Sequence, residues 1–85
     1  MTDEHNDIDT IPLHVHVERA AERYFEALGD AEAHNLYDIF LAEFEKPLLI
    51  ATLKHTRGNQ SKTAQILGLN RGTLRTKLKA YGLLE

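Results

Sequence analysis

The sequence predicts an all-α fold with four helices in each subunit. Apolar residues recur three and four positions apart over residues 13–28 and again beyond residue 35, which is the period of a helix that buries one face. Asparagine and glycine residues lie where these periodic stretches begin and end, as they commonly do at helix termini. We therefore expect a small helical domain of 85 residues, whose core is marginal for a lone chain.

Self-association is the expected way to complete this core. The chain has no cysteine, which excludes disulfides and most structural zinc sites. The absence of cysteine also suits a reducing compartment, and the acidic N-terminus lacks the apolar region of a signal peptide. No apolar run approaches the ~20 residues that span a bilayer. We expect a soluble, cytoplasmic protein with no membrane partner.

The N-terminal half is predicted to hold a tail and the first helix. Residues 1–12 are polar and acidic and show no periodicity, which predicts a disordered tail. From residue 13 the apolar positions form one helical stripe that ends near Gly29, a residue suited to terminate a helix. Together with the second helix, this stripe makes up residues 13–56, which we expect to form the dimerisation region.

The second helix carries more apolar surface than one small domain can cover. It is predicted from an N-cap at Asn35, with Asp38 in its first turn, to about His55, and Pro47 predicts either a kink or a division. Its apolar residues occupy more than the ~100° stripe of a surface helix. The first helix and the same helix of a two-fold related chain can cover them, whereas a buried core helix of a monomer is the alternative. We predict a homodimer interface that includes Tyr24, Leu36, Phe40, Phe44 and Leu48.

Residues 57–85 are predicted to form a helix-turn-helix. Asn59 caps a third helix that ends at Gly68, and Asn70 caps a fourth helix that ends at Gly82. A tight glycine turn sets the second helix of such a pair across the first, so that the second helix protrudes. The faces expected to be buried are Ala64, Ile66 and Leu67 in the third helix and Leu74, Leu78 and Tyr81 in the fourth.

Charge is divided unevenly along the chain. Residues 1–53 carry three basic and twelve acidic residues, a net charge of −9, whereas residues 54–85 carry seven basic residues and one acidic residue, a net charge of +6. A local positive field attracts a polyanion even when the whole chain is acidic. A solvated lysine-rich helix face is the plain alternative explanation of the same charges.

The fourth helix predicts how a polyanion is bound. Arg71, Arg75 and Lys79 recur every four residues and form a strip beside the apolar stripe. The planar fork of arginine can donate two hydrogen bonds to guanine in the major groove, so Arg71 and Arg75 are the candidate base readers, and the other polar side chains position the phosphates. The predicted DNA-binding residues are Asn59, Gln60, Ser61, Lys62, Asn70, Arg71, Thr73, Arg75, Thr76, Lys77 and Lys79.

Catalytic and metal sites are not predicted. His14 and His16 lie two positions apart and thus on different helix faces, without a cysteine nearby. Ser61 is the only serine, and no histidine–carboxylate pair is implied for it. No phosphate-binding glycine motif occurs. We expect a protein that is not an enzyme and needs no cofactor; a helical module whose basic end docks an acidic protein remains the alternative to DNA binding.

Two stretches carry a resemblance to a known family. TRGNQSKTAQILGLNRGTLRTKLKAYG resembles the helix-turn-helix of the Fis (factor for inversion stimulation) family and, more loosely, the terminal DNA-binding domains of NtrC-type activators. AERYFEALGDAEAHNLYDIFLAEFEKPLL also resembles the Fis-family core, including its proline. The resemblance spans about residues 17–84.

The resemblance implies a bacterial, nucleoid-associated regulator of transcription that binds and bends DNA as a homodimer with interwoven helices. The recognition helices enter adjacent major grooves, and weak sequence specificity comes partly from an A·T-rich centre. By motif position, Arg71 matches the contact to an outer guanine, while Asn70 and Thr73 match residues near bases and phosphates. Arg75, Asn59, Ser61, Lys62, Lys77 and Lys79 match backbone contacts or their neighbours.

This sequence also departs from the family pattern. Thr76 and Ala80 replace lysines, which predicts fewer contacts to flanking phosphates. Residues 1–12 are too short for the β-hairpin arm by which the family touches site-specific recombinases, so we do not expect a recombinase contact. A contact with RNA polymerase is left open.

Overall fold

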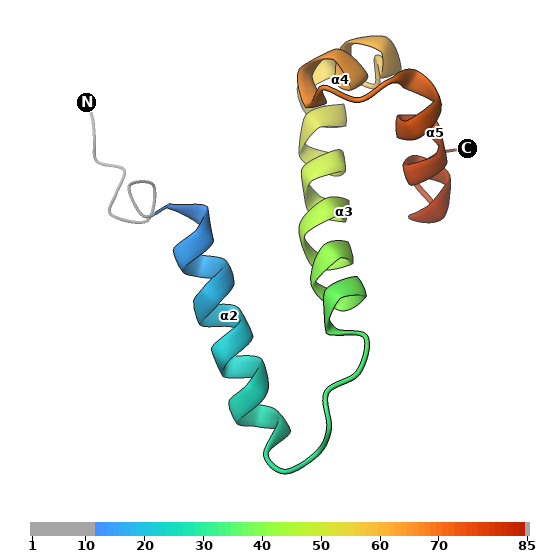
Figure 1. Cartoon of the computed structure of the whole chain (residues 1–85). Helices are drawn as coiled ribbons and strands as arrows, with labels where there is room; N and C mark the ends of the chain where they lie inside the picture. The colour runs from blue at the N-terminus through green and yellow to red at the C-terminus, as the bar shows by residue number, and fades with distance from the viewer. Residues whose placement is uncertain (1–11, 85) are drawn as a thin grey trace, which may run out of the picture. The chain divides into compact units, whose positions relative to one another are not determined.

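The computed structural model describes residues 12–84, and this part of the chain is all-helical (Figure 1). Its helices are α2 (Leu13–Leu28), α3 (Leu36–Thr56), α4 (Gln60–Leu67) and α5 (Arg71–Ala80). The predicted all-α fold with four helices is confirmed. The disordered tail expected for residues 1–12 lies outside the described residues, except for Pro12, which directly precedes α2.

The chain divides into two compact units, Met1–His34 and Asn35–Glu85, of which the first contains α2. This helix begins at the predicted position, and the Pro12 carbonyl accepts a hydrogen bond from the Val15 amide at 3.0 Å. It ends at Gly29, as predicted, where φ is +63°. No residue of α2 is buried, and large apolar side chains such as Phe25 remain exposed.

α3 starts and ends close to the predicted positions. Asn35 is its N-cap residue but lies in the left-handed region at φ 56°, and its side chain makes no capping hydrogen bond, contrary to our expectation. In this conformation only its carbonyl serves the helix, by accepting from the Ile39 amide at 3.0 Å. Pro47 lies inside a single continuous helix, so the proline does not divide it.

The caps of α4 and α5 follow the prediction. The side-chain oxygen of Asn59 accepts a hydrogen bond from the Lys62 amide at 3.0 Å, and that of Asn70 accepts from the Thr73 amide at 2.8 Å. Between the two helices Gly68 adopts a left-handed conformation with φ 76°. These local contacts set where both short helices begin and how closely they follow one another.

The core of the second unit joins its three helices. Leu49 of α3, Ala64 of α4 and both Leu74 and Leu78 of α5 are buried. Figure 1 shows α4 across the C-terminal end of α3, with α5 folding back along it. The side chains packed around this core are Leu53, Leu67, Leu69, Tyr81, Leu83 and Leu84. Among residues 12–84, no helix has the length and apolarity needed to cross a membrane.

Ile66 is the exception to the predicted buried face of α4. Its side chain is 55% exposed, whereas Ala64 is 3% exposed. Successive residues of a helix are rotated by roughly 100°, so a side chain two positions after Ala64 points to nearly the opposite side. Leu67, three positions after Ala64, shares the inward side and is partly buried against the core.

Candidate nucleic-acid interface

The basic side chains of α5 are exposed because its leucines hold another face of the helix against the core. Leu74 and Leu78 are 0% and 1% exposed, and they hold one face of the ten-residue helix against α3 and α4. Arg71, Arg75 and Lys79, which we call the basic strip, are exposed along one flank of that face. Their spacing of four residues places them on successive turns, so they form a line along the helix.

Most other predicted contact residues are also exposed. The structure also exposes Asn70, Thr73 and Thr76, and Thr76 donates its hydroxyl hydrogen to the Gly72 carbonyl at 3.0 Å. At the start of α4, Asn59, Ser61 and Lys62 are exposed, while Gln60 is half-buried. The caps take the Lys62 and Thr73 amides, and the two amides before each of them have no partner within the helix, so the starts of α4 and α5 can both receive an anion.

A hydrogen-bonded pair of threonines, of which Thr63 is buried, fixes the start of α4. Thr63 is 0% exposed. Its hydroxyl lies 2.7 Å from the Thr56 hydroxyl and 2.8 Å from the Asn59 carbonyl, and the Thr56 hydroxyl also lies 3.2 Å from the Leu53 carbonyl. The two hydroxyl groups have two hydrogens for these three contacts, so one hydrogen is shared between two acceptors. The pair joins α3 to α4, and the sequence does not predict it because either threonine alone is an ordinary helical residue.

Glu45 of α3 holds the far end of α5. Its Oε2 lies 2.6 Å from Lys77 Nζ, and its Oε1 accepts a hydrogen bond from the Tyr81 hydroxyl at 2.7 Å. The Lys77 hydrogen bond, followed by that of Tyr81, lowers the pKa of Glu45. The same Glu45 carboxylate raises the pKa of Tyr81. We call Glu45, Lys77 and Tyr81 the carboxylate clamp.

The carboxylate clamp sets Lys77 apart from the rest of the predicted set. The sequence predicts Lys77 as a DNA-binding residue, whereas the structure places its ammonium group against Glu45 of α3. The sequence does not predict a role for Glu45. An acidic residue within a predominantly apolar helix was the available signal, and only the folding back of α5 reveals its partners.

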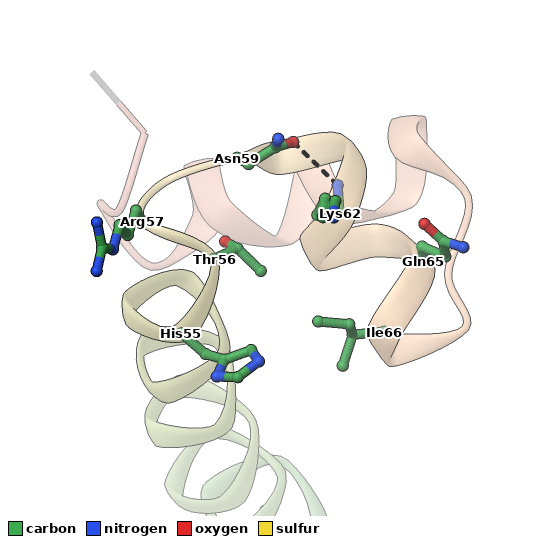
Figure 2. A pocket seen from close by; sticks show the side chains of 7 residues that line it. All are labelled: His55, Thr56, Arg57, Asn59, Lys62, Gln65 and Ile66. Carbon is green, nitrogen blue, oxygen red and sulfur yellow. Dashed lines mark hydrogen bonds between the residues drawn. The ribbon is translucent and has the colours of Figure 1, made fainter.

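An open hollow lies where α3 meets α4 (Figure 2). His55 of α3 and Ile66 of α4 stand on facing sides of it, and Asn59 and Lys62 line its upper part. The hollow explains where Ile66 points when it leaves the core. Among residues 12–84 no group of three or more histidine, aspartate or glutamate side chains can hold a metal ion.

Comparisons with known proteins identify related sequences. A family model described as "Bacterial regulatory protein, Fis family" matches residues 40–81. The chain is 49% identical over 72 residues to DNA-binding protein Fis of Proteus mirabilis (strain HI4320), covering 85% of this chain and 74% of that protein. The chain belongs to the Fis family. DNA-binding protein Fis of Aliivibrio fischeri (strain MJ11) and that of Escherichia coli O1:K1 / APEC are 49% and 47% identical to this chain. Each alignment again spans 72 residues and covers 85% of this chain and 74% of the relative.

Membership of the Fis family confirms the resemblance found in the sequence. The family match takes in most of α3 together with α4 and α5. An alignment of 72 residues is longer than the unit Asn35–Glu85, so it also includes residues that precede Asn35. The Fis family is a family of regulators and not of enzymes. The roles of individual side chains in this Fis-family chain remain predictions.

Proposed function

We propose that this protein is a transcriptional regulator of the bacterial nucleoid that binds and bends double-stranded DNA as a homodimer. The observation that carries the proposal is the exposed basic strip, which is held outward by the buried Leu74 and Leu78. The names of its relatives, DNA-binding protein Fis, support the same function.

The major groove is the proposed seat of α5. A groove of B-form DNA admits a helix of this diameter, and the N-terminal residues of a recognition helix come closest to the base edges. Arg71 is the first residue of α5 and is exposed, so it can donate two hydrogen bonds to a guanine. Arg75, one turn later, lies further along the same strip and is the second candidate. Reading of bases is therefore sparse.

Phosphate contacts fix the position of α5 on the duplex. The candidate phosphate contacts lie on α5 and at the start of α4, where most of these side chains are exposed. Such contacts supply affinity that does not depend on sequence. The proposed phosphate-positioning residues are Asn59, Gln60, Ser61, Lys62, Asn70, Thr73, Thr76 and Lys79.

An uncovered apolar surface supports the homodimer. Tyr37, Phe44 and Leu48 of α3 are 78%, 48% and 40% exposed. Large apolar side chains gathered on one helix mark a protein–protein contact, and two-fold pairing uses the same surface on both chains. We propose the dimer interface predicted from the sequence, in which Phe44 and Leu48 are exposed while Tyr24, Leu36 and Phe40 are partly covered.

Bending follows if the two basic strips of a dimer lie closer together than successive major grooves of straight DNA. A duplex that must curve is selected by how easily it deforms, so A·T-rich centres are preferred without being contacted. Specificity is then weak, in keeping with a nucleoid protein. A regulator seated on a bent promoter lies beside RNA polymerase, which we propose as a further partner.

A binding titration against salt tests this function. With a duplex of about 25 base pairs, the logarithm of the affinity should fall linearly with the logarithm of salt concentration. Arg71→Ala should reduce the preference for a guanine at the site edge by about 1–3 kcal/mol. Arg19→Ala, which removes the same charge from α2, is the matched control and should leave that preference unchanged.

Two results would argue against DNA recognition by α5. Equal weakening on every sequence by Arg71→Ala reduces this arginine to a phosphate contact. Binding to an acidic protein in preference to the duplex would instead support the helical interaction module.

A further inference from the structure

We propose that Lys77 is a positioning residue rather than a DNA contact, and that through Glu45 it fixes the rotation of α5 about its own axis and so aims Arg71. The inference rests on the proposed DNA binding and assigns one basic residue of the recognition helix to a separate role. It also gives a role to Glu45 and Tyr81, which the proposed function does not use.

The ammonium group of Lys77 is paired with a carboxylate of α3. Its Nζ lies 2.6 Å from Glu45 Oε2, and its side chain is 31% exposed, against 15% for Glu45. The other carboxylate oxygen, Oε1, accepts from the Tyr81 hydroxyl at 2.7 Å. Both oxygens of one carboxylate are therefore engaged by α5, from positions one turn apart. Two contacts to one carboxylate restrain the rotation of α5, whereas a single surface ion pair does not.

Helix geometry places Lys77 away from the basic strip. At roughly 100° per residue, Arg71 and Arg75 lie to one side of Leu74, whereas Lys77 lies about 60° to its other side. The buried leucine face thus separates the two. A duplex that meets Arg71 and Arg75 approaches the flank opposite to the one that Glu45 holds.

Exchange of Glu45 for a DNA phosphate as the partner of Lys77 would add little binding free energy. A phosphate would replace Glu45 as the anion beside the ammonium group, and a mostly shielded carboxylate would lose its cation. Release of the lysine would also free α5 to turn. Burial of Leu74 and Leu78 holds α5 against the core but does not fix its rotation, because the burial of apolar surface is not directional. The carboxylate clamp fixes that rotation.

Lys77→Gln and Lys79→Gln form a matched pair, since each removes one charge from α5. We would measure the slope of affinity against salt and the preference for guanine over adenine at the site edge. Lys79→Gln should lower the slope by about 0.9, the value of one phosphate contact, with the preference unchanged. Lys77→Gln should leave the slope unchanged and reduce the preference several-fold.

Two further variants separate positioning from folding. Lys77→Arg keeps the ion pair with Glu45 and should restore the preference. Glu45→Gln should reduce the preference as Lys77→Gln does, and the double variant should lose no more than either single variant, because both changes break one contact. Circular dichroism of each variant establishes that the helices persist.

Three outcomes would overturn the proposal. One is a Lys77→Gln slope that falls as the Lys79→Gln slope does, with the preference retained, since Lys77 is then a phosphate contact. Another is a Lys77→Gln variant that keeps both slope and preference. The third is a double variant whose losses add. Failure of the parent protein to bind duplex with any salt dependence would refute the proposed function instead, which the parent titration shows before any variant is made.

Discussion

Single side chains decide how α5 is held. Leu74 and Leu78 are almost fully buried, and they account for adhesion of the helix to its neighbours. Glu45 adds a contact with defined geometry, because Lys77 and Tyr81 approach its two oxygens separately. The hydrogen bonds also link this contact to pH, since they favour the ionised carboxyl group.

Stability should depend on pH through Glu45. Its pKa in the folded protein is lowered from the ordinary 4.5, first by the hydrogen bond from Lys77 and then by that from Tyr81. A lowered folded pKa contributes stability that is complete above the unfolded value and is lost as the pH falls through the folded value. Glu45→Gln should therefore lower the free energy of unfolding by about 1 kcal/mol at pH 7.

Denaturant unfolding at several pH values measures this effect. The difference between Glu45→Gln and the parent protein should shrink as the pH falls below 4.5. Glu43→Gln alters an exposed carboxyl on the same helix and is the matched control. A difference that stays constant into acid would show that the clamp does not depend on the charge of Glu45.

At the scale of secondary-structure elements, the turn between α4 and α5 depends on one glycine. Gly68 has φ +76°, a conformation that other residues rarely adopt, although a Cβ atom there would meet nothing within 4 Å. Gly72 has no positive φ, and a Cβ atom would lie 3.6 Å from the Asn70 side-chain oxygen, an ordinary contact. The two glycines therefore serve different purposes.

Alanine at each glycine should give opposite changes in stability. Gly68→Ala should cost about 1–2 kcal/mol, from the left-handed backbone alone. Gly72→Ala should stabilise the folded protein by about 0.5–1 kcal/mol, because alanine suits a helix better. The same Gly72→Ala variant should bind DNA less tightly, since its methyl group keeps the first turn of α5 away from the duplex.

Thermal unfolding together with the duplex titration distinguishes these effects. A Gly72→Ala protein that is more stable and binds less tightly confirms that Gly72 serves the interface. Unchanged DNA affinity in that variant would contradict the close approach of the backbone.

The sequence predicted helix positions well because their signals are local. Asn59 and Asn70 cap the helices they were expected to cap, and Gly68 adopts the conformation that its turn needs. Two local predictions were wrong. Asn35 enters the left-handed region in place of side-chain capping, and Ile66 turns out of the core toward the hollow beside α3.

The candidate site was predictable in part. Exposure of the basic strip follows from the spacing of Leu74 and Leu78, which the sequence displays directly. The carboxylate clamp does not, because Glu45 and Tyr81 lie 36 residues apart and meet only when α5 folds back. Periodicity along a helix thus predicts which residues face outward, whereas partners in distant helices require the tertiary fold.

On the scale of the whole molecule, charge and apolar surface are segregated. The last 32 residues hold seven of the ten basic residues, while α3 exposes large apolar side chains along its first half. We infer that the apolar surface joins two chains and that the basic end of each chain meets DNA. The apolar surface and the basic ends act together only if one dimer binds one duplex.

Energy transfer between dyes at the two ends of a duplex of about 25 base pairs is the most direct measurement of that claim. Titration of the protein should raise the transfer efficiency, because bending brings the ends together, and the signal should saturate at two chains per duplex. A duplex that stays straight at saturation, or one that saturates with a single chain, would contradict the account.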